Sequence, residues 1–506
     1  MPSKYLNKIL RARVYDVARE TPLDPMPALS QRLDNEILLK REDLQSVFSF
    51  KLRGAYNKMV NLDQESRDAG VVAASAGNHA QGVALAARRL GIKSLIVMPQ
   101  TTPAIKVGAV RRFGARVTLH GDTYDDAYRH ACELAQDSSM TFIHPYDDPD
   151  VIAGQGTIAM EILRHHRQDM HAIFVPVGGG GLIAGVSAYV KTLYPAIKVI
   201  GVEPDDAPCM HRALKQGRRV VLDQVGLFAD GVAVRQVGKE PFRIARRCVD
   251  EVILVSTDEI CAAIKDIFDN TRSIAEPAGA LGVAGLKKYV EREGLSGTCL
   301  VAIDSGANIN FDRLRHVSER AEVGERREAL IAVTVPERPG SFLEFCRLLG
   351  KRSVTEFNYR YADSAIAHVF AGIELGQGET EKDTIIRQLR DRDYEVVDMT
   401  DNEMAKLHVR YMVGGHAPGL ENEILFRFEF PERPGALMQF LSGIGRRWNI
   451  SLFHYRNHGA AYGRVLVGIQ VAPSDRPSLQ SFLDGLGYDC WEETDNPVYR
   501  LFLGRA

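Results

Sequence analysis

The chain has 506 residues, of which 45% are hydrophobic and 25% are charged, and its formal net charge is −2. These values are typical of an ordinary globular protein, and they exclude a general attraction to nucleic acid or to anionic membranes. The length is too great for one compact core, so we expect two to four domains.

The N-terminus and the cysteines indicate the cellular compartment. The first ten residues, MPSKYLNKIL, contain no signal-peptide core, and no apolar run elsewhere is long enough to span a bilayer. The seven cysteines are scattered, odd in number and form no C-x-x-C pair, so neither a disulfide framework nor a zinc site is expected. We therefore predict a cytoplasmic protein that contacts neither membrane nor nucleic acid.

The first segment with chemical content is FSFKLRGAYNKM, which carries Lys51 at a predicted strand-to-helix junction. Lys51 lies between Phe50 and Leu52, so its amine is expected to be partly buried. Burial lowers the pKa of a lysine amine, which can then attack a carbonyl and afterwards carry a proton. Phe50 is expected either to pack beside a bound ring or to belong to the core.

From about residue 70 to residue 310, short β-branched runs alternate with amphipathic segments of helical length. The predicted strands are 70–75, 93–99, 115–121, 141–145, 172–177, 198–204, 251–256 and 298–304. This alternation favours an α/β fold with largely parallel sheets that are covered by helices on both faces. So many strands indicate two sheets or subdomains with a ligand crevice between them.

The segment SAGNHAQG follows the first of these strands and opens a predicted helix. Its residues Ser75, Ala76, Gly77, Asn78 and His79 would place backbone and side-chain donors at the helix N-terminus, which suits a substrate carboxylate. Serine and asparagine also cap helices without binding a ligand. His79 is open to a purely structural role.

Four glycines at 178–181 follow the predicted strand 172–177 and open another helix. Successive glycines let backbone N–H groups converge on a phosphate, and the helix N-terminus adds a favourable dipole. A dinucleotide fingerprint is the rival interpretation, because Gly179, Gly181 and Ala184 fit G-x-G-x-x-[GA] and Glu203 ends the next strand. That interpretation predicts a nicotinamide-dependent amino-acid dehydrogenase, and it leaves the lysine without a role.

The segment DSGANIN places Ser305 just after the predicted strand 298–304, where the strand end would face the crevice. An amine that can form an imine, a phosphate cradle and polar groups for a flat heteroaromatic ring are what pyridoxal 5'-phosphate requires. A hydroxyl at the ring nitrogen makes the ring a weaker electron sink than an aspartate would, which favours elimination over transamination. Strand alternation should point Asp304 the other way.

The C-terminal part of the chain has a different pattern. Residues 312–330 are dense in charge, and we expect the end of one domain and a helical or extended connector there. Beyond them the chain repeats itself after about 95 residues. Each copy predicts strand, PERPG turn, helix, strand, strand, helix and strand, which is the ferredoxin-like α+β order. Two copies favour a paired, two-lobed domain, and a ligand sensor is more plausible there than a second active site.

The segments SFKLRGAYNKM, SAGNHAQG, VGGGGLIAG, EPAGALG and SGANINFDRLR resemble the fold-type II pyridoxal phosphate enzymes related to tryptophan synthase β. Within that group the resemblance is closest to the biosynthetic threonine deaminases, and it runs from about residue 5 to the C-terminus. It implies a catalytic domain with two parallel-sheet subdomains over 1–320 and a connector over 321–328. Ferredoxin-like (ACT-like) regulatory modules would occupy 329–401 and 423–495.

The resemblance also implies individual roles. Lys51 would be the catalytic residue, holding the cofactor as an imine and removing the substrate Cα proton. The other residues of the cofactor site would be Phe50, Asn78 at the 3-oxygen, Gly178, Gly179, Gly180, Gly181 and Leu182 around the phosphate, and Ser305 at the ring nitrogen. The substrate would lie on Ser75, Ala76, Gly77, Asn78 and His79. Some relatives bind a divalent cation through an acidic pair, but Cys209 replaces the second acid after Glu203, so no metal is assigned.

The implied activity is that of a threonine ammonia-lyase, which converts L-threonine to 2-oxobutanoate and ammonia by α,β-elimination and also acts on L-serine. As the first committed step of isoleucine biosynthesis it would be inhibited by isoleucine, with valine opposing, in a homotetramer. Tyr359 and Tyr455, at equivalent places in FNYRY and FHYRN, either line the effector sites or pack in the core. A catabolic-type serine/threonine dehydratase, another fold-type II lyase, a nicotinamide-dependent dehydrogenase and a non-catalytic amino-acid sensor are the alternatives.

Overall fold

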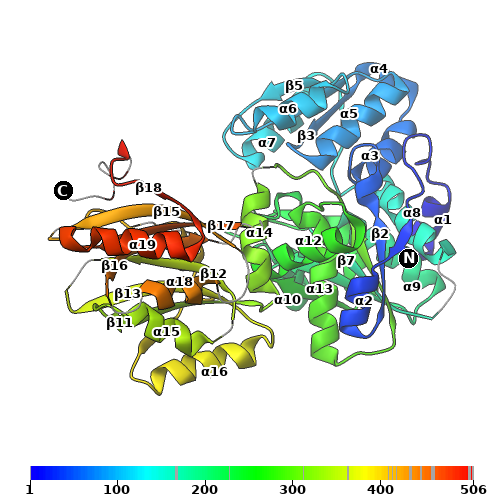
Figure 1. The fold of residues 1–506 in the computed structure, drawn as a ribbon. Helices are drawn as coiled ribbons and strands as arrows, with labels where there is room; N and C mark the ends of the chain where they lie inside the picture. Colours follow the sequence, from blue (N-terminus) through cyan, green and yellow to red (C-terminus); the bar gives the residue numbers. More distant parts are fainter. Residues whose placement is uncertain are drawn as a thin grey trace. The chain divides into compact units, whose positions relative to one another are not determined.

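The computed structural model describes residues 2–165, 169–226, 228–311, 313–350, 352–361, 364–407, 409–412, 414–417, 419–431, 436–444, 447–456, 462–497, 499 and 503. The chain divides into two compact units, Met1–Ala321 and Glu322–Ala506, and each is described by itself (Figure 1). Within the described part of the chain, no helix is both long and apolar enough to cross a membrane.

The larger sheet of the first unit has six strands in the order β1-β2-β10-β7-β8-β9. Its strands are β1 (Leu23–Pro25), β2 (Glu36–Arg41), β7 (Met170–Pro176), β8 (Lys198–Pro204), β9 (Glu251–Val255) and β10 (Cys299–Asp304). Only β1 pairs antiparallel with its neighbour, and all other pairs are parallel. The short antiparallel β1 and its neighbour β2 lie before residue 70, outside the predicted run of alternating strands and helices.

Helices cover both faces of this sheet. One core contains residues of α1 (Pro2–Leu10), α8 (Pro149–His165), α9 (Gly181–Leu193), α10 (Cys209–Gln216) and α11 (Lys239–Cys248). The opposite core contains residues of α2 (Pro27–Leu33), α12 (Thr257–Thr271) and α13 (Pro277–Glu293). Alternate residues of β7 enter the two cores, Ile173 on one side and Phe174 on the other, as expected for a strand buried on both faces.

The smaller sheet of the first unit has four parallel strands in the order β5-β4-β3-β6. Its strands are β3 (Val71–Ala74), β4 (Ser94–Met98), β5 (Arg116–Leu119) and β6 (Thr141–Phe142), and its helices are α3 (Lys51–Val60), α4 (Gln64–Ala69), α5 (Asn78–Leu90), α6 (Ala104–Arg111) and α7 (Tyr124–Asp137). All eight strands predicted between residues 70 and 304 are present. The prediction of two largely parallel sheets is confirmed.

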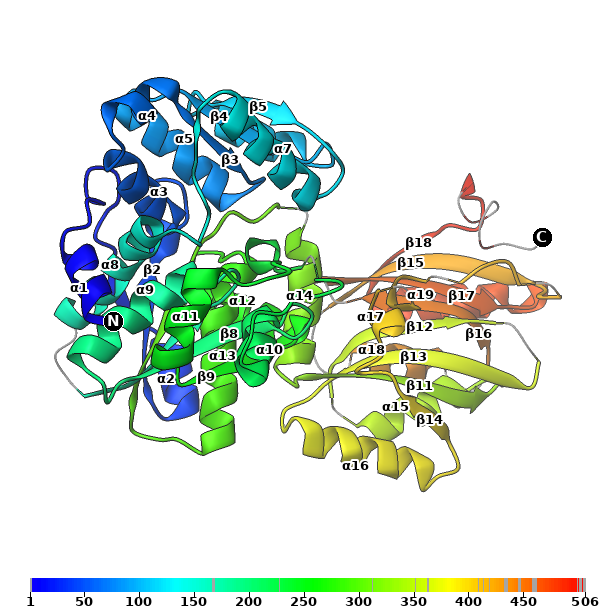
Figure 2. The same cartoon turned by 180° about the vertical axis from the view of Figure 1, so that it is seen from behind.

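The second unit contains one antiparallel sheet of eight strands in the order β14-β11-β13-β12-β16-β17-β15-β18 (Figure 2). The first copy of the repeat is β11 (Glu328–Pro336), α15 (Ser341–Leu349), β12 (Val354–Arg360), β13 (Ile366–Glu374), α16 (Glu379–Arg390) and β14 (Glu395–Asp398). The second copy is β15 (Glu423–Pro431), α18 (Ala436–Ile444), β16 (Asn449–Arg456), β17 (Tyr462–Gln470), α19 (Arg476–Leu486) and β18 (Asp489–Glu492). The predicted ferredoxin-like order is confirmed in both copies.

The two copies join through antiparallel pairing of β12 with β16, from Glu356 opposite Arg456 to Arg360 opposite Leu452. The boundary between the units falls within α14 (Arg313–Gly324), whose residues Val317 and Ala321 belong to the core of the first unit. In the first PERPG segment, Gly340 adopts a φ of 92° as the N-cap of α15, a conformation that favours glycine. Of the second PERPG segment, at 431–435, residues 432–435 lie outside the described residues.

Candidate functional site

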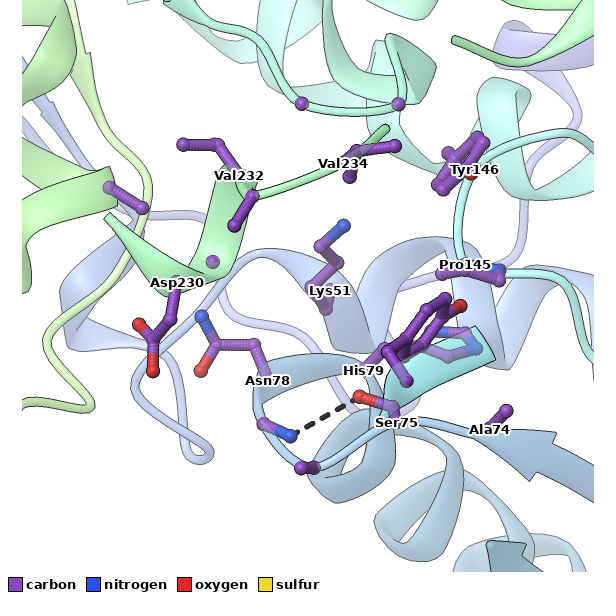
Figure 3. A pocket seen from close by; sticks show the side chains of 18 of the residues that line it. Lys51, Ala74, Ser75, Asn78, His79, Pro145, Tyr146, Asp230, Val232 and Val234 are labelled. Carbon is purple, nitrogen blue, oxygen red and sulfur yellow. Dashed lines mark hydrogen bonds between the residues drawn. The ribbon is translucent and has the colours of Figure 1, made fainter. Parts of the chain in front are cut away.

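A cavity of about 1840 Å³ lies in the first unit at the carboxyl ends of strands from both sheets. Short loops after β3, β7 and β10 form its walls, which is the usual place for a ligand in a parallel α/β fold. The predicted residues that line it are Phe50, Lys51, Ser75, Ala76, Gly77, Asn78, His79, Gly178, Gly179, Gly180, Gly181, Leu182 and Ser305 (Figure 3).

Lys51 is the first residue of α3, and backbone pairing brings it close to the end of β10. Ser49 forms an isolated antiparallel bridge with Gly306, and the Phe50 N–H donates to the carbonyl oxygen of Ser305 at 3.3 Å. The prediction of a strand before Lys51 is therefore wrong, because the pairing is limited to this single bridge. The bridge nevertheless ties the lysine to the segment that carries the serine.

The environment of Lys51 changes its chemistry. Burial lowers the pKa of its amine to about 8, although the carboxylate of Glu276 acts in the opposite direction. The neutral, nucleophilic amine is thus accessible near neutral pH. The Nζ atom lies 5.1 Å from the centre of the Phe50 ring, and Phe50 itself is 7% exposed and packs in the core.

The glycine segment connects β7 to α9. Gly180 is the N-cap of α9 with a φ of 91°. A Cβ atom on Gly179 would lie 2.3 Å from the ring of Tyr146, and one on Gly178 would lie 2.9 Å from the Cα atom of Val232. Residues larger than glycine therefore do not fit at positions 178 and 179, because Val232 and Tyr146 occupy the space that their side chains would need. The first N–H groups of a helix have no partner within the helix, so this segment is suited to bind a phosphate.

The loop after β3 opens α5, with Gly77 as the N-cap. The Gly77 N–H donates to Ser75 Oγ at 3.2 Å, which fixes the turn (Figure 3). A Cβ atom on Gly77 would meet no atom within 4 Å, so this turn faces open space. The Nε2 atom of His79 lies 2.8 Å from the Ile143 carbonyl oxygen, and burial lowers the pKa of its imidazole to about 3. His79 is accordingly uncharged and anchored to the backbone.

At the end of β10, neighbouring residues point in different directions. The Ser305 hydroxyl donates to the Ala278 carbonyl oxygen at 3.3 Å, and Ser305 lines the cavity. Asp304 accepts from the Gly306 N–H at 3.2 Å and is fully buried. Burial, with a contribution from Asp43, raises the pKa of the Asp304 carboxyl well above its usual range. This geometry agrees with the alternation expected along the strand.

Glu203 has a structural position. Its carboxylate accepts from the N–H groups of Met210 and His211 at 2.7 and 2.8 Å, and so it caps the N-terminus of α10. The Cys209 thiol also donates to it at 3.4 Å. The dinucleotide interpretation thereby loses its acidic residue. Across the described residues there is no group of three or more His, Cys, Asp and Glu side chains that could hold a metal ion.

Several lining residues were not singled out from the sequence. They include Tyr146, Asp230, Val232, Glu276 and Asn308. The motifs EPAGALG and SGANINFDRLR contain Glu276 and Asn308, so their place in a matched motif was the available signal. Tyr146 and the residues of η2 (Asp230–Val232) come from connecting segments that carry no periodic pattern.

In the second unit the two predicted effector tyrosines lie on paired strands. Tyr359 is opposite Phe453, and Phe357 is opposite Tyr455. In each pair, the tyrosine of one copy thus faces the phenylalanine of the other copy. Tyr359 and Tyr455 are buried and belong to the same core. The Tyr359 hydroxyl donates to the carboxylate of Glu337 in the first PERPG turn.

Comparison with known proteins extends these observations to the whole chain. Residues 14–306 match the family described as pyridoxal-phosphate dependent enzyme, and residues 319–409 and 414–503 match the C-terminal regulatory domain of threonine dehydratase. L-threonine dehydratase biosynthetic IlvA of Burkholderia multivorans is 57% identical over 502 residues, which cover 99% of each chain. Its namesake from Escherichia coli is 55% identical over 503 residues, covering 99% of this chain and 97% of the relative.

A solved structure gives the same result for nearly two thirds of the chain. The processed form of threonine deaminase isoform 2 from Solanum lycopersicum aligns with a TM-score of 0.62 and 52% identity, covering 63% of this chain and 93% of that one. With both domain types matched and the relatives aligned over nearly their full length, the chain belongs to the biosynthetic threonine dehydratases, a family of pyridoxal-phosphate-dependent lyases with a C-terminal regulatory domain.

Proposed function

We propose that the chain converts L-threonine to 2-oxobutanoate and ammonia, with Lys51 as the catalytic amine, and that L-serine is a second substrate. The reaction would be the first committed step of isoleucine biosynthesis. The observation that carries this proposal is the position of Lys51 in a cavity that it shares with the glycine segment and with Ser305. Its amine has a pKa lowered to about 8, which suits both imine formation and proton transfer.

Pyridoxal phosphate fits the residues present in the cavity. The N-terminus of α9, from Gly178 to Leu182, would hold the phosphate, because side chains are excluded there and N–H groups are available. Ser305 would meet the ring nitrogen, Asn78 the ring 3-oxygen, and Phe50 would lie near the ring. When bound, the cofactor supplies an electron sink that stabilises negative charge at the substrate Cα.

The protein would bind the substrate carboxylate and move one proton. The N-terminus of α5, over residues 75–79, offers backbone donors to the carboxylate of threonine. Lys51 Nζ would then take the proton from Cα, and the β-hydroxyl group would take up a proton and leave the neighbouring carbon as water. The released enamine would tautomerise and be hydrolysed by a second water molecule to 2-oxobutanoate and ammonia. Ser305, a neutral donor, limits how strongly the ring nitrogen is held protonated, and this favours elimination over transamination.

A lysine substitution tests the assignment. Lys51→Ala should lose turnover by several orders of magnitude and remain folded, and borohydride reduction of the native holoenzyme followed by peptide mapping should label Lys51. Lys58→Ala removes another lysine of the same helix and should remain active. Substantial turnover in Lys51→Ala, or a label on another lysine, would refute the proposal.

The second unit would regulate the first. The modules 329–401 and 423–495 would bind isoleucine as an inhibitor and valine as its antagonist, with Tyr359 and Tyr455 at the effector sites of a homotetramer. Two contacts support a link between the modules, because Glu337 accepts from Tyr359 of the first copy and from Asn449 of the second, the latter at 2.8 Å. An effector must bind two conformations of the protein unequally to inhibit it.

The effector assignment has its own test. Tyr359→Phe and Tyr455→Phe should raise the isoleucine concentration that gives half-inhibition, while the uninhibited rate stays unchanged. Light scattering would give the subunit number. Unchanged isoleucine inhibition in both variants would exclude the two tyrosines from the effector sites.

A further inference from the structure

Glu276 lies directly before α13, where a side chain could cap the helix, but its side chain points into the cavity instead. Glu276 is the N-cap residue of α13, yet its side chain makes no capping hydrogen bond to that helix. Its carboxylate instead lines the same cavity as Lys51, and only 3% of the residue is exposed. Burial of a carboxylate is costly unless partners compensate it, so this orientation needs an explanation other than capping.

The carboxylate holds the side-chain amide of Asn78. The Nδ2 atom of Asn78 donates to Glu276 Oε1 at 2.6 Å. At the other end of the amide, Asn308 Nδ2 donates to Asn78 Oδ1 at 2.7 Å, and Asn308 is itself anchored on the Val47 carbonyl oxygen at 2.8 Å. The orientation of the amide is therefore fixed at both ends. Since an amide nitrogen carries two N–H groups, one N–H of Asn78 remains for a ligand.

Two glycines leave room for the carboxylate. A Cβ atom on Gly306 would lie 3.0 Å from Glu276 Oε1, and one on Gly231 would lie 3.4 Å from it. The Glu276 N–H also donates to the Gly306 carbonyl oxygen at 3.0 Å, which links the start of α13 to the residue after Ser305. The carboxylate is thus enclosed between η2 and the segment that carries the serine of the ring site.

Charged groups reach the carboxylate from four elements. They are Lys51 of α3, Lys106 of α6, Asp230 of η2 and Asp304 of β10. Burial, followed by the negative charge of Asp230, raises the pKa of Glu276 to about 7, and its hydrogen bonds and Lys106 act in the opposite direction. Asp230 forms an ion pair with Lys106 at 2.7 Å, and Figure 3 shows Asp230, Asn78 and Lys51 lining one pocket.

We propose that Glu276 is a positioning residue of the cofactor site, whose carboxylate aims the second N–H of Asn78 at the ring 3-oxygen and releases that alignment when it takes up a proton. The proposal rests on the proposed function, because it uses Asn78 as the ligand of the 3-oxygen. Glu276 acts through Asn78 and takes no part in proton transfer to or from the substrate. The two partners of the Asn78 amide, the Glu276 carboxylate at its nitrogen and the Asn308 amide at its oxygen, allow only one of its two flipped orientations.

The visible absorption spectrum of the holoenzyme tests this, since it responds to the hydrogen bond at the ring oxygen and needs no turnover. Between about pH 5 and about pH 9, the native spectrum should change with a midpoint near pH 7. Glu276→Gln should remove that transition and weaken pyridoxal phosphate binding about tenfold, the size of one charge-assisted hydrogen bond. If Glu276→Gln kept both the pH transition and the cofactor affinity of the native protein, the proposal would be overturned.

A second variant leaves Glu276 and Asn78 in place. Asp230→Asn removes the neighbouring negative charge from an exposed position, so the spectral midpoint should move to lower pH. An unchanged midpoint would also overturn the proposal, even if Glu276→Gln does not fold. Borohydride labelling of Lys51 in each holoenzyme separates the two hypotheses. Label on Lys51 with unaltered spectra refutes the role of Glu276 alone, whereas absence of label refutes the proposed function.

Discussion

The guanidinium of Arg53 meets the carboxylate of Glu161 at 2.6 Å, and neither side chain is exposed. Arg53 also pairs with Glu42 at 2.8 Å, and Lys40 pairs with Glu161 at 2.6 Å, again with all side chains fully buried. Arg53 lies two residues after Lys51 in α3, while Glu161 belongs to α8. The network therefore fixes the helix that begins with Lys51.

Loss of one charge from this network should be strongly destabilising. Glu161→Gln leaves two buried cations with too little compensation and is expected to reduce the free energy of unfolding by about 3–5 kcal/mol. Denaturant unfolding measures this. Arg13→Ala, which breaks the exposed ion pair with Asp16, is the control and should cost less than about 1 kcal/mol. Equal effects of the two substitutions would contradict the role of the buried network.

The lowered pKa of Lys51 predicts a pH-dependent stability of the cofactor-free chain. Its amine has a pKa of about 8 in the folded state against an ordinary value of 10.5, so between these pH values the unfolded state binds more protons. The native chain should therefore gain stability as the pH rises through this window. Lys51→Met removes the penalty and should be more stable by roughly 3 kcal/mol at neutral pH, with the difference closing above about pH 10. Denaturant unfolding of both chains at several pH values measures this difference in the free energy of unfolding. A difference that does not change with pH would contradict the expectation.

A glycine of α5 controls the position of α3. A Cβ atom on Gly82 would lie 3.0 Å from the Leu52 backbone nitrogen and 3.1 Å from the carbonyl carbon of Lys51. Gly82→Ala should push the start of α3 by tenths of an ångström and reduce turnover about tenfold or more, because a misplaced catalytic group costs rate. Steady-state kinetics on threonine measures this.

Gly108→Ala provides the matched control for that experiment. Gly108 also lies within a helix, α6, but a Cβ atom there would meet no atom within 4 Å. The substitution should preserve turnover and stabilise the helix by up to about 1 kcal/mol. Comparable losses of turnover in both variants would show that helix glycines matter for reasons other than contact with α3.

Removal of the second unit should separate catalysis from regulation. A chain that ends at residue 324 retains the complete cavity and should still deaminate threonine, but isoleucine should no longer inhibit it. The absorbance of the bound cofactor verifies that the shortened chain is folded. Isoleucine inhibition that persists in this chain would place the effector site in the first unit.

The sequence predicted the parts of the site that depend on local pattern. Lys51, the 75–79 loop, the glycine segment and Ser305 each follow or open a regular element, and parallel strands bring their carboxyl ends to one edge. The direction of the Glu276 side chain could not be predicted, because the groups around its carboxylate, the Asn78 amide and the backbone at Gly231 and Gly306, come from distant parts of the chain. A residue before a proline at a helix start ordinarily suggests a cap.

The buried charges were equally hidden from the sequence. Residues 40–43, KRED, are all buried, although a run of four charged residues usually lies on a solvated surface. Arg41 pairs with Asp43 at 2.7 Å within the run, but Lys40 pairs with Glu161, which is far away in the chain. Such pairing depends on tertiary contacts and leaves no periodic signal.

The backbone ladder between β12 and β16 also bears on the ancestry of the chain. Once the duplicated copies shared one sheet, loss of either copy would leave β12 or β16, which lie in the middle of the joined sheet, as an unpaired edge strand and a template for aggregation. The sequences of the two copies can therefore diverge from each other, but deletion of either copy alone is disfavoured.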